Sequence, residues 1–364
     1  MACPSIFIYD SIPCQGGVAR YFRHVADGLI AHFGAQATIF SSRASNYGPA
    51  RHIRALPLNF RGSRRLGIYR INDFLAGWMA DRRHPAVFYS PYFGNVRTTA
   101  AQVFMVYDMI HELCFPRTRA IQAFIDEKKR CIERATLLIA ISQSTARDIV
   151  ACYPQVDPAR IVTIWLGVDE FFFEAPPIPD RGQKPYFLYV GNRRGYKNFR
   201  RTVQAFGQAG LAKNFDLRII SPRRVDGFNR EEVALLCPYN LKNSVDLRLA
   251  VSEDELRASY AGAVALVYPS EYEGFGLPVL EAMAAGTLVA AANAASIPEI
   301  AGNIALYFDP QSIDSIADAL QRMAALSEAD RRVRIAQGIV HARQFSWARC
   351  QQQTVEAISR LLSP

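Results

Sequence analysis

This sequence of 364 residues lacks several common signatures, and each absence removes a class of protein. Its seven cysteines are scattered, with no C-x-x-C pair and no histidine at metal-ligand spacing, which argues against a disulfide framework or a structural zinc site. No uncharged apolar run reaches the roughly 18 residues that a membrane helix needs. The N-terminal stretch MACPSIFIYD has neither the basic region nor the apolar run of a signal peptide. We therefore expect a cytoplasmic protein, soluble or peripheral to a membrane.

Acidic residues are scarce in the first half of the chain. Residues 1–170 contain 20 Lys and Arg against 13 Asp and Glu, a net charge of +7, whereas the remainder has 22 against 20, a net charge of +2. A basic half attracts nucleic acid, an anionic membrane surface or a phosphorylated substrate, or it is only a solvated face. We find no nucleic-acid motif, so no nucleic-acid partner is expected.

Short β-branched or aromatic runs alternate with helical stretches, which predicts parallel sheets covered by helices. Strands are predicted at 5–10, 37–40, 86–90, 102–108, 137–142, 160–168, 186–191, 216–220, 245–249, 263–270 and 287–291. Helices are predicted at 18–33, 66–81, 118–134, 143–151, 198–209, 252–261 and 278–285. Residues 171–185 contain four prolines and are predicted to be a linker.

The expected fold class is therefore α/β, with two Rossmann-like doubly wound domains that face each other across a cleft. These domains are residues 1–170 and residues 186–345. A C-terminal helix is expected within residues 346–364, where it can cross back to the first domain. In doubly wound sheets, ligands bind outside the carboxyl ends of the strands.

The stretch YPSEYEGFGLPVLE, residues 268–281, combines two glycines, two prolines and three glutamates. A buried strand is expected to end near Tyr268. A helix is expected to begin at Pro278, because proline is preorganised for the first helical position. The turn between them would present backbone N–H groups to a phosphate or diphosphate. These N–H groups belong to Gly274, Phe275, Gly276 and Leu277.

Two carboxylates flank this anion site, Glu273 on the loop and Glu281 in the expected first turn of the helix. Each can accept hydrogen bonds from sugar hydroxyls while the N–H groups bind phosphates, which is the layout of a nucleotide sugar. Taken singly, either acid is explained as well by the helix dipole or by solvation. A NAD-dependent oxidoreductase is disfavoured, because GFGLPV has Val279 where the dinucleotide fingerprint needs Gly or Ala.

A second cluster follows the strand at 186–191, where YVGNRRGYKN contains Arg193, Arg194 and Lys197. Preplaced cations would stabilise the charge of a leaving diphosphate, although a solvated basic turn is the alternative. Gly16 and Gly17 lie between the first strand and the first helix. They indicate a close approach of backbone to a ligand, or a simple tight turn.

These residues resemble the signature of glycosyltransferase family 4, which comprises retaining enzymes with the two-domain GT-B fold. Glu273 and Glu281 match the family's pair of glutamates separated by seven residues. The resemblance extends over nearly the whole chain. It includes the segments IPCQGGVARYF, VYDMIHELCFP, AISQSTARDI, YVGNRRGYKNF and FSWARC.

The resemblance implies a role for each matching residue. Glu273 would contact hydroxyls of the transferred sugar, and Glu281 would contact the ribose. Arg193 and Lys197 would bind the diphosphate, together with the backbone of 275–277. The remaining positions are Gly17 against the donor, and Asp108, His111 and Gly16 near the sugar or the acceptor.

Three departures from the family pattern leave details open. The usual His-Asp pair is Tyr107-Asp108 here, so the sugar-contacting histidine is missing unless His111 replaces it. Asn192 separates the glycine from the arginines, so either Arg193 or Arg194 is the phosphate ligand. The glycine-rich turn after the next strand is replaced by SPRR, residues 221–224.

The implied activity is retaining transfer of a hexose, with mannose from GDP-mannose as the first expectation, to a lipid-linked or polysaccharide acceptor. The alternatives are a UDP-sugar donor and a non-catalytic nucleotide-sugar binder. No D-x-D motif is present, so neither a metal nor another cofactor is expected. The basic first half favours peripheral attachment to an anionic membrane on its inner face.

Overall fold

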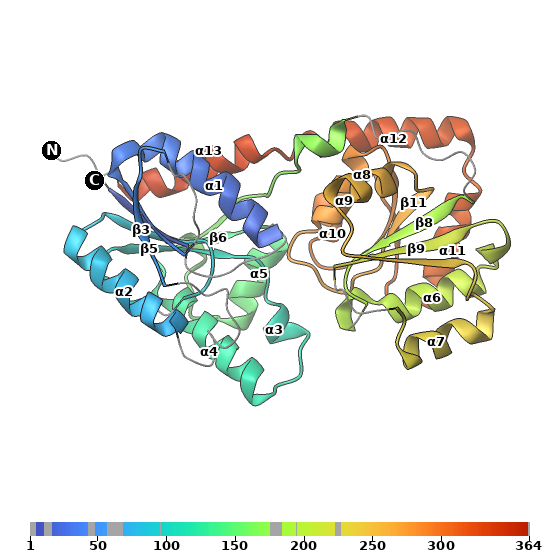
Figure 1. Cartoon of the computed structure of the whole chain (residues 1–364), viewed down its shortest axis with the longest axis horizontal. Helices are drawn as coiled ribbons and strands as arrows, with labels where there is room; N and C mark the ends of the chain where they lie inside the picture. The colour runs from blue at the N-terminus through green and yellow to red at the C-terminus, as the bar shows by residue number, and fades with distance from the viewer. Residues whose placement is uncertain are drawn as a thin grey trace. The chain divides into compact units, whose positions relative to one another are not determined.

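The computed structural model describes residues 5–10, 17–42, 48–56, 68–94, 96–174, 184–193, 195–222 and 227–362. The chain forms two compact units, Met1–Gly167 with Trp347–Pro364, and Val168–Ser346. Each unit contains one sheet with helices on both of its faces (Figure 1). All strand pairs described in both sheets are parallel, as the alternating sequence pattern predicts.

The sheet of the first unit has the strand order β3-β2-β1-β4-β5-β6-β7. The chain leaves β1 toward one edge through β2 and β3 and then returns to β4, so the order reverses between β1 and β4. The strands are β1 Ile6–Asp10, β2 Ala37–Ser41, β3 Arg51–Arg54, β4 Val87–Ser90, β5 Ala101–Val106, β6 Leu137–Ala140 and β7 Ile161–Thr163. Strand β7 ends well before residue 168, and β3 is absent from the sequence prediction.

The helices of the first unit cover this sheet. They are α1 Gly17–Phe33, α2 Ile68–Arg83, α3 Ile110–Leu113, α4 Arg119–Arg134, α5 Gln143–Cys152 and the C-terminal α13 Trp347–Arg360. Figure 1 shows α13, in red, beside α1, in blue. The side chain of Gln351 donates to the His24 carbonyl at 2.7 Å, and the ring of Trp347 stacks on that of His24 at 4.5 Å between centroids. These contacts tie the end of the chain to the first unit.

Helix α2 packs on the sheet through small side chains. Ala76 and Ala80 are fully buried against the aromatic layer formed by Phe7, Phe40 and Phe88. The ring centroids of Phe7 and Phe88 lie 5.6 Å apart in a stacked arrangement. The small alanine side chains let the helix approach the sheet closely. The face of α2 opposite to these alanines lies outside the core.

The sheet of the second unit has the order β10-β9-β8-β11-β12-β13, which is the dinucleotide-binding order in which the reversal lies between the first and fourth strands. The strands are β8 Tyr186–Val190, β9 Asp216–Ser221, β10 Val245–Leu249, β11 Ala265–Tyr268, β12 Leu288–Ala292 and β13 Leu306–Phe308. Strand β10 has the predicted bounds, whereas β13 is absent from the prediction.

Seven α-helices lie among the described residues of the second unit. They are α6 Phe199–Gln208, α7 Arg230–Leu236, α8 Glu253–Ala261, α9 Leu277–Ala284, α10 Ile297–Ala301, α11 Ile313–Ala324 and α12 Glu328–Ala342. The sequence prediction contains α6, α8 and α9, each within one residue at its ends, and lacks the others. Of the predicted linker, residues 175–183 lie outside the described residues, while Glu170–Phe173 forms a short 3-10 helix.

Candidate active site

Strands β8 and β11 are neighbours at the point where the strand order of the second sheet reverses. From β8 the chain continues to β9 on one side, and from β11 it continues to β12 on the other. The connections therefore diverge and leave a crevice at the carboxyl edge, which is where doubly wound sheets bind ligands. Both motifs singled out in the sequence lie in the loops that border this crevice.

The first loop connects β11 to α9. Strand β11 ends at Tyr268 as predicted, and Gly276 forms the N-cap of α9 at φ 114° and ψ 45°, which is backbone that favours glycine. Helix α9 begins at Leu277, so Pro278 is its second residue and not the first. The first amides of a helix have no partner within it, an arrangement that is suited to binding an anion.

A serine fixes the shape of this loop. The Ser296 hydroxyl, which is fully buried, lies 2.8 Å from the carbonyl oxygens of both Glu273 and Phe275. Phe275 is itself buried and meets the ring of Phe345 edge-on at 6.2 Å. Because these contacts hold two of its carbonyl groups and the Phe275 ring, the loop has a fixed shape.

The two loops meet through an ion pair. The Lys197 ammonium lies 2.5 Å from Glu273 Oε1, and the two side chains are 15% and 13% exposed. Lys197 closes the short 3-10 turn after β8, and Glu273 belongs to the loop after β11. Burial and the nearby Glu273 carboxylate raise the pKa of the Tyr268 hydroxyl well above its usual value. A cation and a carboxylate predicted from separate motifs are thus direct neighbours.

Asn198 braces the same two loops, and the sequence reasoning missed it. It adopts left-handed backbone at φ 56°, and its side-chain amide donates to the carbonyls of Pro269 at 3.1 Å and Pro310 at 2.7 Å. Arg201 adds a second link, because its guanidinium contacts Asn198 Oδ1 at 3.1 Å and Glu271 at 2.5 Å. An asparagine directly after Lys197 was the available signal, since asparagine tolerates this backbone.

Glu281 does not lie in the first turn of α9, which corrects the sequence expectation. It is the fifth helical residue, and only 5% of its surface is exposed. The Tyr260 hydroxyl donates to Glu281 Oε2 at 2.9 Å. Because the helix begins one residue earlier than expected, Glu281 moves from the first turn to the second and lies within the packed unit.

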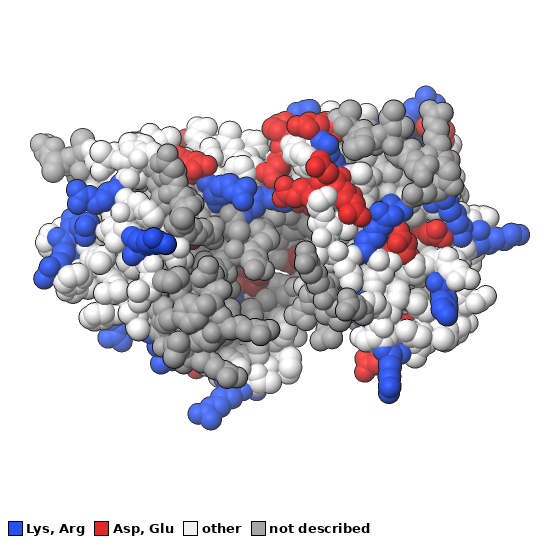
Figure 2. Space-filling view, in the orientation of Figure 1, with Lys and Arg blue, Asp and Glu red and all other residues white. Residues whose placement is uncertain are grey.

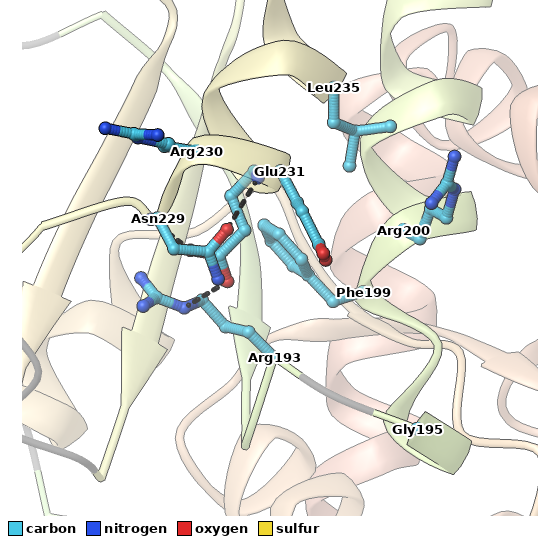
Figure 3. Close-up of a pocket in the computed structure, with 9 residues that line it drawn as sticks. Arg193, Gly195, Phe199, Arg200, Asn229, Arg230, Glu231 and Leu235 are labelled. Atoms are coloured by element: carbon cyan, nitrogen blue, oxygen red, sulfur yellow. Dashed lines mark hydrogen bonds and ion pairs between the residues drawn. The ribbon is translucent and has the colours of Figure 1, made fainter.

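Arg193 has different neighbours from Lys197. Its guanidinium lies 3.0 Å from the carboxylate of Glu232 in α7 and donates to the Gly227 carbonyl at 3.1 Å. Figure 3 shows the side chain directed toward Asn229 and the start of α7. Arg193 and Lys197 thus have different ion-pair partners, Glu232 and Glu273. Arg194 lies outside the described residues, as do 223–224 of the SPRR turn.

A cavity of about 670 Å³ opens beside Arg193 (Figure 3). Its walls come from the start of α6 and from α7, including Phe199, Arg200 and Glu231. Glu232 closes a capping box with Asn229, whose side chain accepts from the Glu232 amide at 2.9 Å. The start of α7 is thereby fixed against Arg193, next to the β8 side of the crevice.

The remaining predicted residues lie in the first unit. Gly17 is the first residue of α1, directly after residues 11–16, and Gly16 lies outside the described residues. Asp108 follows β5, and its carboxylate accepts from the Ile110 amide at 3.1 Å. His111 lies in α3, stacked on Phe115 at 5.2 Å between ring centroids.

A buried ion pair supports the Asp108–His111 segment. The Lys128 ammonium contacts Glu112 at 2.8 Å and donates to the Asp108 carbonyl at 2.9 Å, with both charged side chains at most 3% exposed. Tyr153 donates to the other Glu112 oxygen at 2.8 Å. Burial, and then the positive charge of Lys128, lower the pKa of His111. The sequence reasoning assigned no role to Lys128 or Glu112.

Two further properties bear on the chemistry. Among the described residues, no group of three or more His, Cys, Asp or Glu side chains is arranged to hold a metal ion. Within the same residues, no helix has the length and apolar character needed to cross a membrane.

Known proteins resemble both the sequence and the fold. O-antigen chain mannosyltransferase B of Escherichia coli is 29% identical over 335 residues, which cover 88% of this chain and 85% of that protein. Sucrose-phosphate synthase from Thermosynechococcus elongatus superposes with a TM-score of 0.77 at 19% identity, covering 98% of this chain and 99% of that one. HepE from Anabaena, solved with UDP and glucose, gives a TM-score of 0.72 at 16% identity over 98% and 100% of the two chains.

Two family descriptions match adjacent parts of the chain. "Glycosyltransferase Family 4" matches residues 15–170, and "Glycosyl transferases group 1" matches residues 171–338. Together they cover residues 15–338 without a gap, which includes every described strand except β1. The chain is therefore a glycosyltransferase that belongs to family 4 and has the GT-B fold.

Proposed function

We propose that this glycosyltransferase moves mannose from GDP-mannose, with retention of configuration, to a lipid-linked or polysaccharide acceptor. The sugar and the acceptor are favoured by the likeness to the Escherichia coli O-antigen chain mannosyltransferase, which spans most of both chains. The donor site is the crevice between β8 and β11. The observation that carries the proposal is the contact between Lys197 and Glu273 beside the start of α9.

The two residues of this ion pair suit the two parts of a sugar diphosphate, the lysine the diphosphate and the glutamate the sugar. The diphosphate would lie against the first amides of α9 and would attract the Lys197 ammonium. The hexose would lie on the Glu273 side, where the carboxylate accepts hydrogen bonds from hydroxyls. With no donor bound, the lysine and the carboxylate neutralise each other in a site that is mostly shielded from water.

Transfer breaks the bond between the anomeric carbon and the diphosphate oxygen and forms one to the acceptor hydroxyl oxygen on the same face. The acceptor's proton goes to the leaving diphosphate, so no side chain needs to act as a nucleophile. Negative charge grows on the diphosphate in the transition state, and Lys197 with the α9 amides would stabilise it. Glu273 would hold the hexose in position while the bond breaks.

Other residues would bind the outer parts of the donor. Glu281, held by Tyr260, would contact the ribose, and Gly17 of the first unit would lie against the donor. Arg193 would bind the diphosphate if its guanidinium exchanges Glu232 for phosphate oxygens. Asp108 and His111 would contact the sugar or the acceptor.

Calorimetry with GDP, UDP and ADP tests the base of the donor. We expect GDP to bind most tightly. HepE of the same fold was solved with UDP and glucose, so the alternative is a UDP-sugar donor. Binding of UDP alone would overturn the choice of GDP-mannose and leave the position of the site intact.

The Glu273→Ala variant tests the site itself, with Glu328→Ala as the matched control, because Glu328 is a glutamate on the solvent side of α12 with a 71% exposed side chain. We expect Glu273→Ala to lose donor turnover by about 100-fold or more while the control keeps it. Unchanged turnover in Glu273→Ala would mean that the site lies elsewhere. Nucleotide-sugar binding without any turnover in the parent protein would mean that the protein is a non-catalytic binder.

The acceptor is expected at a membrane surface, on its inner face. The basic residues of the first half would attract anionic headgroups or the phosphates of a lipid-linked acceptor. Pelleting with anionic vesicles at low salt tests this part separately. No pelleting would contradict the membrane part and leave the transfer reaction standing.

A further inference from the structure

Helix α2 presents large apolar side chains to solvent. Ile71, Phe74 and Trp78 are 45%, 72% and 45% exposed, on the side opposite to the buried Ala76 and Ala80. Their spacing of three and four residues brings them onto one strip of the helix. A surface helix of a soluble protein normally carries polar residues there, and a continuous exposed apolar patch marks a binding surface.

This strip stands out from the rest of the described surface. Nine large apolar side chains are exposed among the described residues, and three of them lie on this one strip. An exposed phenylalanine and tryptophan on adjacent turns are unfavourable in water. Both side chains are favoured at the boundary between lipid headgroups and acyl chains.

Two cations border the strip, Arg70 and Arg82, whereas Arg83 ends the helix on the side of Ala76 and donates to the Met79 carbonyl. Arg70, Arg82 and Arg83 are exposed on the same helix, and the Arg82 guanidinium lies 4.0 Å from the centre of the Trp78 ring. Figure 2 shows the surface around α2 mainly in white and blue. The helix also carries two acids. Asp73 is buried and accepts a hydrogen bond from the Tyr9 hydroxyl, and Asp81 accepts from Thr98 and Thr99.

We propose that the α2 face, defined as Ile71, Phe74 and Trp78 with Arg70 and Arg82, docks on an anionic lipid bilayer. The apolar strip enters the headgroup boundary, and the arginines contact lipid phosphates. The strip spans two turns, about 10 Å along the helix, so α2 lies flat on the surface. This inference rests on the proposed function only in naming the membrane as the place of the acceptor.

The arginines favour a bilayer over a second copy of the chain. A symmetric dimer through this face would bring the same patch against itself, so that each arginine approaches the arginines of the other copy. Like charges close together at an interface with low dielectric are repulsive. An anionic headgroup layer instead supplies opposite charge to all of them.

The test is sedimentation of the full chain with vesicles of phosphatidylglycerol and phosphatidylcholine in a ratio of about 3:7, against pure phosphatidylcholine. We expect Phe74→Ser/Trp78→Ser to reduce partitioning into the anionic vesicles about tenfold or more. Arg70→Gln/Arg82→Gln should reduce it about fivefold for each arginine removed. In about 1 M salt, where charge is screened, the arginine variant and the parent protein should partition into the vesicles equally.

The matched control is Val333→Ser/Val340→Ser, which removes two exposed apolar side chains from α12 in the second unit, 57% and 66% exposed. It should bind vesicles like the parent protein. The proposal is overturned if Phe74→Ser/Trp78→Ser, called the α2 variant below, binds anionic vesicles as well as the control does. It is also overturned if the parent protein does not bind anionic vesicles. A parent that is dimeric and an α2 variant that is monomeric in light scattering would also overturn it, in favour of a second copy.

Fluorescence gives an independent measurement. Trp78 should be quenched by lipids brominated near the headgroup, and the quenching should disappear in Trp78→Phe. Donor binding separates this inference from the proposed reaction. The α2 variant should bind nucleotide as the parent does, whereas Glu273→Ala should lose turnover and still bind vesicles.

Discussion

Lys197 and Glu273 are joined by an ion pair of 2.5 Å, although 75 residues separate them in the chain. Each follows a strand of the second sheet, and the two strands are neighbours where the strand order reverses. The pairing is therefore a consequence of the topology, which brings distant loops to one edge.

Replacing Lys197 should impair the transfer step more than the fold. Lys197→Ala removes the cation beside the diphosphate and leaves Glu273 without its partner, so turnover should fall about 100- to 1000-fold. Lys242→Ala, on an exposed position of the same unit, should change little. Equal turnover in the two variants, measured with a soluble acceptor, would contradict the role of Lys197.

Asn198 should be a residue on which the local stability of the site depends. Asn198→Ala leaves the carbonyls of Pro269 and Pro310 without their donor and forces alanine into left-handed backbone. We expect a loss of about 2–4 kcal/mol in the free energy of unfolding. Asn240→Ala is the control, because Asn240 has similar backbone at φ 52° and is exposed. Urea titration that gives the same loss for both would show that backbone strain alone accounts for the effect.

Gly276 should matter through its backbone angle. An added methyl has room, since its nearest neighbours would be Tyr268 at 3.8 Å and Val279 at 3.9 Å, but φ 114° is rarely adopted by alanine. Gly276→Ala should therefore shift the start of α9 and weaken nucleotide binding about tenfold, at a strain of about 1–3 kcal/mol. Gly210→Ala, at φ 69° in open space, should leave nucleotide binding unchanged in calorimetry. If Gly276→Ala binds nucleotide as tightly as the parent protein, the backbone angle of Gly276 is not needed for binding.

The buried pair of Lys128 and Glu112 should behave differently from a surface pair. Lys128→Met leaves the Glu112 carboxylate buried without its cation, so the first unit should lose about 3–5 kcal/mol. Lys129 is the neighbouring residue in the chain, and its ion pair with Glu133 is more exposed, with side chains 43% and 33% exposed. Lys129→Met should therefore lower the free energy of unfolding by at most about 1 kcal/mol. Thermal unfolding compares the two variants, and similar melting temperatures would contradict the prediction.

His111 should make the stability of the first unit depend on pH. Burial, followed by Lys128, lowers its pKa in the folded protein, so the folded state binds fewer protons than the unfolded chain. The stability from the neutral ring is complete above the unfolded pKa of about 6.5 and is lost as the pH falls through the folded pKa. Urea midpoints at pH 7.5 and 5.0 should therefore differ less in His111→Gln than in the parent. The exposed His52→Gln should match the parent, and an equal difference in all three proteins would refute the prediction.

The sequence predicts the local geometry of the site well and its contacts poorly. The end of β11 at Tyr268 and the start of α9 within one residue follow from glycine and proline, whose backbone preferences act locally. The pairing of Arg193 with Glu232 and of Glu281 with Tyr260 depends on how separate elements pack, which no local pattern specifies. Strand β3, with the exposed sequence RHIR, has the composition of a loop and becomes a strand only by pairing with β2.

A crystal structure of the protein soaked with GDP-mannose tests the central claim most directly. We expect the diphosphate to lie against the first amides of α9 and the Lys197 ammonium, with the hexose hydroxyls bound to Glu273 in place of the present ion pair. A donor bound elsewhere, with Lys197 and Glu273 still in contact, would contradict it.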